Sequence, residues 1–255
     1  MYNELLKIGD FTLYSYGLMM GLGIICAILL TEYRAGRNGL KADAIFYLAV
    51  WGVIGGFAGS KLLYFITELP QIIKNPSIIL NFSQGFVVYG AIIGGIAGGA
   101  IYLRIAGLPF LPYFDLVMPS VALAQGIGRI GCFLAGCCYG RETDAWYGIV
   151  FPHSDIAPEG VKLIPTQLFS SILDFFHFGI LIVIGRKAKK NGIVGACYLL
   201  FYGLGRFAVE QLRDDPRGNI GFLSTSQFIS LFWIFIGAGL LLWTKIKGST
   251  IQKQV

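Results

Sequence analysis

The chain has 255 residues, of which 55% are hydrophobic and only 13% are charged, and its formal net charge is +6. The apolar content lies above that of soluble proteins and the charged content far below it. This composition excludes an ordinary soluble globular protein and directs attention to the apolar runs.

Apolar runs recur along almost the whole chain, and each has about the length that a bilayer requires. A transmembrane helix needs roughly 20 mostly apolar residues. We therefore predict an all-α integral membrane protein with about seven transmembrane helices, forming a single polytopic domain over residues 1–255. The first run lacks a convincing signal-peptide cleavage site, so we expect it to be retained. The runs cover residues 14–30, 44–66, 86–103, 114–134, 167–185, 194–210 and 226–243.

Lysine and arginine cluster in alternate loops, whereas most of the acidic residues lie in the others. Positively charged loops concentrate on the cytoplasmic side of a membrane. The pattern predicts an external N-terminus, a cytoplasmic C-terminus and an odd number of spans. It also favours a membrane over nucleic acid as the partner of the positive charge. The basic set comprises Arg34, Arg37, Lys41, Arg104, Arg186, Lys187, Lys189, Lys190, Lys245, Lys247 and Lys253.

The longest polar stretch, residues 136–165, is predicted to be an external loop. Loops of that length are usually functional or disordered. Several large apolar residues in it indicate order, so we expect a small cap on the outer membrane face. They are Trp146, Tyr147, Ile149, Val150 and Phe151.

Glycines recur about four residues apart in the second and third runs. Small residues at this spacing allow helix backbones to approach closely in lipid. The pattern predicts tight packing between these helices rather than chemistry. The glycines are Gly52, Gly55, Gly56, Gly59, Gly90, Gly94, Gly95, Gly98 and Gly99.

Arg129 lies in the outer part of the fourth run, within the glycine-rich segment 126–140. A cation at such a position costs about 2.5–3.5 kcal/mol on insertion scales. We therefore expect Arg129 to face protein, water or an anionic partner in a functional site. A snorkelling side chain or a buried ion pair is the structural alternative.

The sixth run ends in a charged stripe formed by Arg206, Glu210 and Arg213. Their spacing of i, i+4 and i+7 places them on one helical face. A carboxylate between two arginines can hold each guanidinium and leave donors free for a phosphate. Together with Arg129, the stripe predicts a site for a phospholipid headgroup; a salt-bridged helix end anchored at the interface is the alternative.

Five other polar residues in the spans or loops give weaker signals. Lys61, Asp115 and Asp174 lie in or at the ends of spans and are expected to be structural. His153 lies in the predicted loop and His177 in the fifth run, and neither has metal-ligand spacing with another histidine or acid. We expect none of them to form a metal site.

Cysteines are few, and they do not form the disulfide framework of a small secreted protein. Cys132, Cys137 and Cys138 lie near the outer face, where they suggest either a thiol nucleophile or a metal site. No second pair of ligands completes the four that a zinc site usually requires. We therefore predict no metal.

Several motifs match together along the chain. The motifs Tyr-Gly-Leu-Met at 16–19, Pro-Thr-Gln-Leu at 165–168, and Arg206-Phe207 with Glu210 and Arg213 accompany a longer signature. With these matches the chain resembles, over nearly its full length, the bacterial phosphatidylglycerol:prolipoprotein diacylglyceryl transferase family. The family signature Gly-Arg-Ile-Gly-Asn-Phe-Ile-Asn-Gly-Glu, then an aromatic residue and Gly, is matched at Gly128, Arg129, Ile130, Gly131, Phe133, Gly136, Tyr139 and Gly140.

The resemblance implies seven spans in the bacterial cytoplasmic membrane, with a site on the external side. It implies transfer of diacylglyceryl from phosphatidylglycerol to the lipobox cysteine of a secreted prolipoprotein, without metal or soluble cofactor. Arg129 and Arg206 would hold the phosphate and neutralise the departing glycerol phosphate. Tyr16 would position the lipid. The other implied substrate-binding residues are Gly128, Gly131, Gly136, Tyr139, Gly140, Gln167, Glu210 and Arg213.

The chain departs from the family pattern at several positions. Tyr89 replaces the usual histidine of the third run, and we expect its phenol to take over proton handling. In the signature, the two asparagines and the glutamate are replaced by Cys132, Ala135 and Cys137, and Ile164 replaces the histidine before Pro165. A related transferase with a glycerophospholipid donor and a glycan or polyprenyl-linked acceptor is therefore one alternative. A small transporter is another.

Overall fold

The computed structural model describes residues 4–9, 11–80, 85–152, 154, 156–214 and 218–247. In this part of the chain, seven helices are long and apolar enough to cross a membrane. The prediction of an all-α fold with seven spans is therefore confirmed, while the orientation of the termini stays a prediction. The seven are α1 (Ser15–Arg37), α2 (Asp43–Thr67), α4 (Val88–Ile105), α5 (Phe110–Ala135), α6 (Thr166–Lys187), α7 (Ile193–Glu210) and α8 (Thr225–Lys247).

The helix bounds differ most from the predicted ones at the end of α1, which continues seven residues beyond the apolar run. The polar turns that follow the run are helical, and the helix ends only where Gly39 adopts a φ of +68°. There the Leu40 N–H donates to the Ala35 carbonyl at 3.0 Å. Backbone capping, rather than hydropathy, sets this boundary.

Short elements lie before the first span and between later ones, and the hydropathy pattern did not predict them. The described residues include three antiparallel strand pairs, each formed by two strands that follow one another in the chain. The elements are β1 (Glu4–Ile8) with β2 (Phe11–Tyr14), β3 (Ile149–Val150) with β4 (Lys162–Leu163), β5 (Asn219–Ile220) with β6 (Leu223–Ser224), α3 (Leu69–Lys74) and the 3-10 helix Pro76–Leu80.

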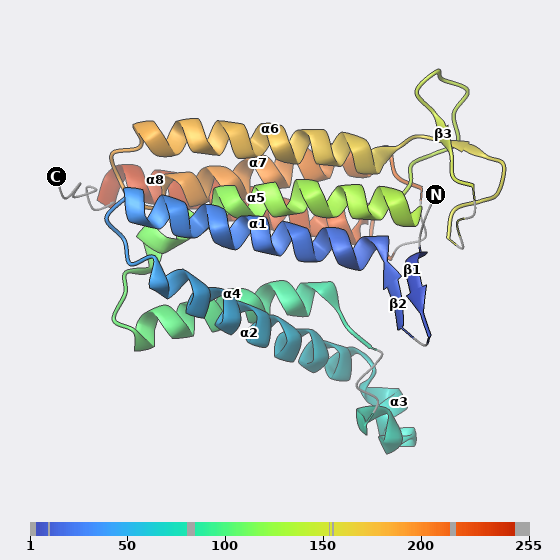
Figure 1. Cartoon of the computed structure of the whole chain (residues 1–255), viewed down its shortest axis with the longest axis horizontal. Helices are drawn as coiled ribbons and strands as arrows, with labels where there is room; N and C mark the ends of the chain where they lie inside the picture. The colour runs from blue at the N-terminus through green and yellow to red at the C-terminus, as the bar shows by residue number, and fades with distance from the viewer. Residues whose placement is uncertain are drawn as a thin grey trace. The chain divides into compact units, whose positions relative to one another are not determined.

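The chain divides into two compact units. The hairpin unit comprises Glu32–Phe110, and the bundle unit comprises Met1–Thr31 and Leu111–Val255. Figure 1 shows α5, α6, α7 and α8 running side by side in the bundle unit. The single domain predicted from the sequence stays a prediction.

In the hairpin unit, α2 and α4 pack backbone against backbone. A Cβ added to Gly94 would clash with the carbonyl oxygen of Gly55 and lie 2.9 Å from the Cα of Gly59. The predicted glycine packing is therefore confirmed. Lys61 is 6% exposed, and its ammonium lies 4.8 Å from the centroid of the Phe86 ring, a cation–π contact.

In the bundle unit, α5 anchors the start of α7. The Asp115 carboxylate accepts hydrogen bonds from the backbone N–H groups of Gly192 at 2.6 Å and Gly195 at 2.7 Å. These groups belong to the unsatisfied donors at a helix N-terminus. The structural role predicted for Asp115 is confirmed.

The segment between α5 and α6 is ordered around a small core of its own. Phe151 is fully buried and Leu163 is 3% exposed, and Phe133 and Tyr139 pack against them. Its order was predicted, and its placement outside the membrane stays a prediction.

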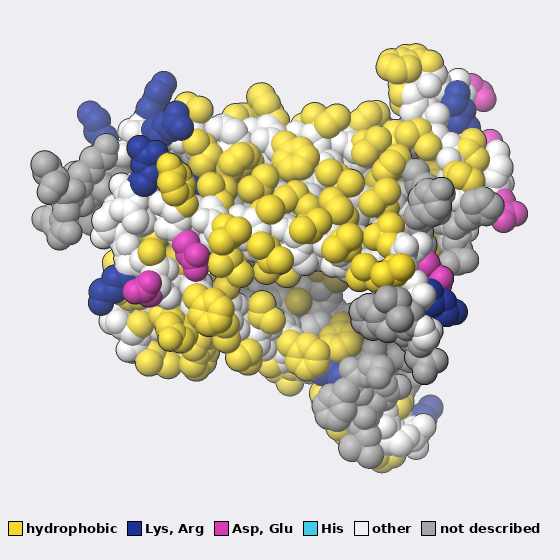
Figure 2. All heavy atoms as spheres, in the orientation of Figure 1, with side chains coloured by type: hydrophobic (Ala, Val, Ile, Leu, Met, Phe, Trp, Pro, Cys, Tyr) yellow, Lys and Arg dark blue, Asp and Glu magenta, His cyan; other side chains and the backbone are white. Residues whose placement is uncertain are grey.

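Figure 2 shows hydrophobic side chains over most of the visible face of the bundle unit, and basic ones at the end where α6 and α8 finish.

Candidate active site

A pocket in the bundle unit opens between α5, α6 and α7. Arg129 of α5 and Arg206 of α7 both line it, although they are far apart in the sequence. The predicted convergence of these two arginines is therefore present. The lining also includes Ser170, Leu173, Asp174, Phe176, His177, Ile180, Phe201, Tyr202, Gly205 and Val209.

Arg129 makes no hydrogen bond or ion pair with any residue that the structure describes. Its electrostatic neighbours include the phenol of Tyr202 and the carboxyl of Asp174. Arg206 is also close enough to interact with it electrostatically, and like charges repel. A guanidinium inside a membrane span that makes no hydrogen bond or ion pair with protein points to an anionic ligand.

Arg206 is held more firmly than Arg129. Its Nη2 lies 2.8 Å from Oε2 of Glu210 and donates to Oγ of Ser226 at 3.0 Å. Its Nη1 is buried and has no hydrogen-bond partner among the described residues. One edge of this guanidinium is therefore fixed by protein, while the other nitrogen retains donors for a ligand.

Glu210 is 7% exposed and connects the charged stripe. Oε1 accepts a hydrogen bond from the Ser224 hydroxyl at 3.0 Å, and Oε2 lies 4.0 Å from Nε of Arg213. The predicted arrangement, with one carboxylate between two arginines, is present. Because the Glu210 carboxylate forms an ion pair with Arg206, Glu210 is a positioning residue for that guanidinium.

Asp174 and His177 line the pocket, although sequence reasoning left both outside the site. Asp174 is 9% exposed and interacts electrostatically with Arg129 and Arg206. Nε2 of His177 is buried without a hydrogen-bond partner among the described residues, and its ring stacks on Tyr198 at 5.2 Å. Their i, i+3 spacing in an apolar span is the signal that could have identified them.

The glycines of the signature allow α1 to lie against α5. A Cβ on Gly131 would lie 3.0 Å from the Cβ of Met19 and 3.4 Å from the Cα of Tyr16. A Cβ on Gly128 would lie 3.0 Å from a sulfur, Sδ of Met20. Tyr16 is 43% exposed and interacts electrostatically with Arg129. The substrate-binding roles predicted for Tyr16, Gly128 and Gly131 stay predictions.

The start of α6 holds the loop that follows α5. Gln167, which is 1% exposed, donates from Nε2 to the Cys137 carbonyl at 2.7 Å. The Thr166 hydroxyl donates to the Cys138 carbonyl at the same distance. Gly140 forms a β-bridge with Arg213. In the structure these contacts position the loop, and direct contact of Gly136, Tyr139, Gly140, Gln167 and Arg213 with substrate stays a prediction.

Thiols of this loop interact with one another and with Arg213. Hydrogen bonds with Cys132 and Cys137, followed by the nearby Arg213 guanidinium, lower the pKa of the Cys138 thiol despite its burial. Hydrogen bonds with Cys132 and Cys138, together with burial, raise the pKa of the Cys137 thiol. Negative charge in the cluster is therefore favoured on Cys138.

Tyr89 is not among the residues that line the pocket. Tyr89 is half-buried in the first turn of α4, in the hairpin unit. Its catalytic role stays a prediction. His153 lies outside the described residues.

Residues 3–243 match the model of the family described as prolipoprotein diacylglyceryl transferase. The chain belongs to this family. The phosphatidylglycerol–prolipoprotein diacylglyceryl transferase of Clostridium tetani is 51% identical over 225 residues, which cover 88% of this chain and 90% of the relative. The second transferase of that name from Clostridium perfringens is 52% identical over 239 residues, covering 92% and 93%.

Family membership confirms the resemblance seen in the sequence. A more distant relative of the same name, from a Nostoc species, is 32% identical over 253 residues, covering 95% of this chain and 89% of the relative. Together with the seven apolar helices, membership identifies this prolipoprotein diacylglyceryl transferase family member as a multi-pass membrane protein.

Proposed function

We propose that the protein transfers the diacylglyceryl group of phosphatidylglycerol to the cysteine thiol of a secreted prolipoprotein and releases a glycerol phosphate. The observation that carries this proposal is the pair of arginines in one pocket. Arg129 makes no hydrogen bond or ion pair with the described residues, and Arg206 has a buried nitrogen without a hydrogen-bond partner among them. Family membership gives the reaction type.

The two guanidinium groups bind the lipid phosphate between them. Guanidinium groups form paired hydrogen bonds with phosphate oxygens, and such charge-assisted bonds are strong in a site that excludes water. When the acceptor sulfur attacks the glyceryl carbon, the C–O bond breaks and the phosphate oxygen keeps the electron pair. The added negative charge then forms where Arg129 and Arg206 already lie, so it is stabilised in the transition state.

The apolar lining of the pocket suits the acyl part of the donor. Leu173, Phe176 and Ile180 of α6 line it together with Phe201 and Val209 of α7. A diacylglyceryl group that stays among apolar side chains and lipid keeps its chains out of water during transfer.

The site belongs on the external side of the bacterial cytoplasmic membrane, where a secreted acceptor arrives. The basic residues support this orientation, because α6 and α8 both finish in Lys- and Arg-rich turns at the end opposite the loop after α5.

The test uses purified protein, phosphatidylglycerol labelled in its glyceryl group and a lipobox peptide. We expect mass spectrometry to detect the peptide thioether with one glycerol phosphate released per modified peptide. Release of glycerol phosphate without peptide modification would contradict the acceptor assignment. No lipid turnover in folded protein would contradict the reaction itself.

A further inference from the structure

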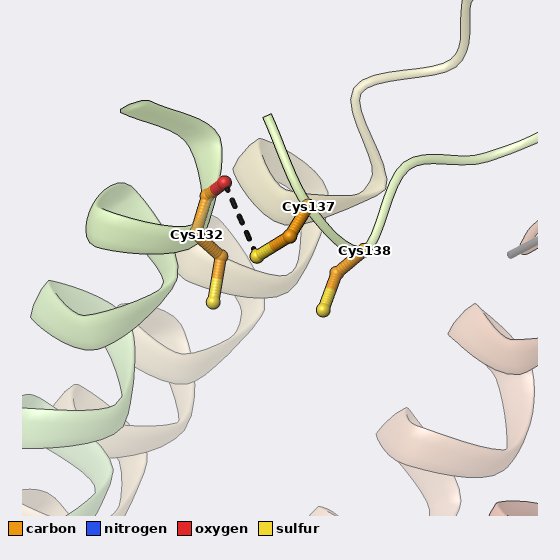
Figure 3. Close-up of side chains that lie close together, drawn as sticks. All are labelled: Cys132, Cys137 and Cys138. Carbon is orange, nitrogen blue, oxygen red and sulfur yellow. Dashed lines mark hydrogen bonds between the residues drawn. The ribbon is translucent and has the colours of Figure 1, made fainter. Parts of the chain in front are cut away.

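Three cysteine side chains gather where α5 ends. The Sγ atoms of Cys132, Cys137 and Cys138 all lie within 4.8 Å of one another, and none of the five cysteines, all of them described, forms a disulfide. Figure 3 shows the three side chains pointing into one space between the end of α5 and the following loop. The phosphate-binding role proposed above does not use them.

The helix cap explains why these residues meet. Gly136 has a φ of +68°, the Cys137 N–H donates to the Cys132 carbonyl at 3.1 Å, and the Gly136 N–H donates to the Phe133 carbonyl at 3.2 Å. These bonds form a Schellman motif, which places the second residue after the helix over the third residue from its end. Cys137 therefore lies against Cys132 as a consequence of the local fold.

Cys138 joins them through an unusual backbone conformation. Its φ is +65°, a value that residues other than glycine adopt rarely and at a cost of about 1–3 kcal/mol. Hydrogen bonds from Thr166 to the Cys138 carbonyl and from Gln167 to the Cys137 carbonyl, both 2.7 Å, hold this turn. The cluster is therefore organised before any ligand binds.

The spacing of the sulfurs favours a cation over a disulfide. With Zn–S bonds of about 2.3 Å, tetrahedral geometry places two sulfurs roughly 3.8 Å apart. A disulfide requires sulfurs about 2.05 Å apart. Sulfurs that all lie within 4.8 Å of one another need a smaller movement to bind a cation.

We propose that Cys132, Cys137 and Cys138 bind a thiophilic cation of the Zn²⁺ class and leave its fourth position open for the thiol of the acceptor. The second half of this statement rests on the proposed function, whereas the cation site does not. Catalytic zinc sites use three protein ligands and an open position, whereas the expectation that no metal binds rested on four ligands.

Charge and location both fit this role. Three thiolates with Zn²⁺ carry a net charge of −1, which the Arg213 guanidinium beside Cys138 offsets. Arg129, the proposed phosphate ligand, interacts electrostatically with Cys132 and Cys138. A thiol bound at the cluster would therefore lie near the lipid phosphate.

The coordination step balances as an exchange of ligands. A water molecule would occupy the fourth position before the acceptor binds. The acceptor S–H bond breaks, the sulfur keeps both electrons and binds Zn²⁺ in place of this water, and the departing water carries the proton to solvent. The bound thiolate then forms the C–S bond as the glyceryl C–O bond breaks. Thiol activation would thus depend on this cluster.

The first experiment titrates the purified full-length protein with Co²⁺, whose thiolate complexes absorb visible light, and measures bound Zn²⁺ by elemental analysis. We expect one ion per chain, and affinity lower by on the order of 100-fold in each of Cys132→Ser, Cys137→Ser and Cys138→Ser. Cys26→Ser and Cys197→Ser, on α1 and α7, are the matched controls and should bind normally. No ion in folded protein, or equal loss in the controls, would overturn the site.

A second measurement avoids substitutions altogether. Zn²⁺ added to the unaltered protein should protect Cys132, Cys137 and Cys138 from a maleimide, with Cys26 and Cys197 unaffected, as peptide mapping would show. Unprotected cluster thiols would overturn the proposal even if every serine variant misfolded.

The acceptor half is tested with the Co²⁺-loaded protein and two lipobox peptides, one with cysteine and one with serine. We expect only the cysteine peptide to change the visible spectrum. An unchanged spectrum, or full peptide modification by metal-free protein, would overturn coordination of the acceptor. A spectral change without lipid turnover would instead leave this site standing and refute the proposed reaction.

Discussion

The α2–α4 pair and the α5–α6–α7 group use small residues in opposite ways. In the first, glycines face glycines, and a Cβ on Gly94 would overlap the backbone of Gly55. In the second, Gly205 lines the pocket, and a Cβ there would meet nothing within 4 Å. Glycine on both helices closes an interface, whereas glycine opposite large side chains leaves space for a ligand.

The two regions also differ in how their charged side chains are engaged. Lys61 of α2 is a cation whose ammonium lies over aromatic rings. In the pocket, Arg129 makes no hydrogen bond or ion pair with the described residues, and only part of the Arg206 guanidinium is engaged. The comparison therefore separates a packing region from a binding region, and each substitution below should affect one of them.

The largest effect is expected from Arg129→Ala and Arg206→Ala. Each should lower turnover of phosphatidylglycerol by about 10²- to 10³-fold, because electrostatic groups of this kind contribute about 2.7–4 kcal/mol to transition-state stabilisation. Arg186→Ala, an exposed residue at the far end of α6, is the control and should keep full activity. Normal turnover in either pocket variant, measured on folded protein, would end the phosphate assignment.

The substitution Tyr89→Phe tests whether the hairpin unit has a chemical role in addition to packing. If the phenol handles a proton, the variant should lose about 10²-fold in kcat, the usual contribution of general acid–base catalysis. Tyr102→Phe, on the same helix, serves as the control. Unchanged rates would remove Tyr89 from the mechanism and leave this unit without a chemical role.

Gly94→Ala should destabilise the protein by about 1–3 kcal/mol, because two backbones must separate to admit the methyl group. Thermal unfolding in detergent measures the loss. Gly52→Ala provides the contrast, since its Cβ would lie 3.9 Å from the Gly95 carbonyl oxygen, an ordinary contact. Equal stability of the two variants would argue against the close packing.

Gly205→Ala should have the smallest effect and the opposite sign in stability. Alanine in a helix interior is favoured over glycine by roughly 0.5–1 kcal/mol. The added methyl group would occupy pocket space, so lipid affinity should fall by up to about tenfold. Unfolding and lipid-binding measurements on one preparation check the changes in stability and in lipid affinity. Unchanged affinity would mean that the lipid does not contact the pocket at Gly205.

Hydropathy predicted the seven spans because a helix in lipid must be apolar over its whole length. It also identified Arg129 and Arg206, since a charge inside such a run is conspicuous. Asp174 and His177 were missed as site residues because their i, i+3 spacing places them on one face of α6 but does not reveal which helix that face packs against. That information depends on packing between α5, α6 and α7.

The three cysteines near the outer face were noted in the sequence, but the gathering of their sulfurs was not predicted, for a different reason. Counting ligand pairs along the chain ignored Gly136, the helix-stop signal between Cys132 and Cys137. A glycine at that position folds the following residue back on the helix, so the sequence did contain the signal. The short strand pairs and the extended end of α1 depend on local hydrogen bonds that hydropathy does not report.

The central claim is that Arg129 and Arg206 bind one phosphate, and a double-mutant cycle on phosphatidylglycerol affinity tests it most directly. If the phosphate is shared, Arg129→Ala with Arg206→Ala should lose little more affinity than either single substitution, with a coupling free energy of at least about 1 kcal/mol. Losses that add to within about 0.5 kcal/mol would show that the two arginines act independently and would contradict the shared site.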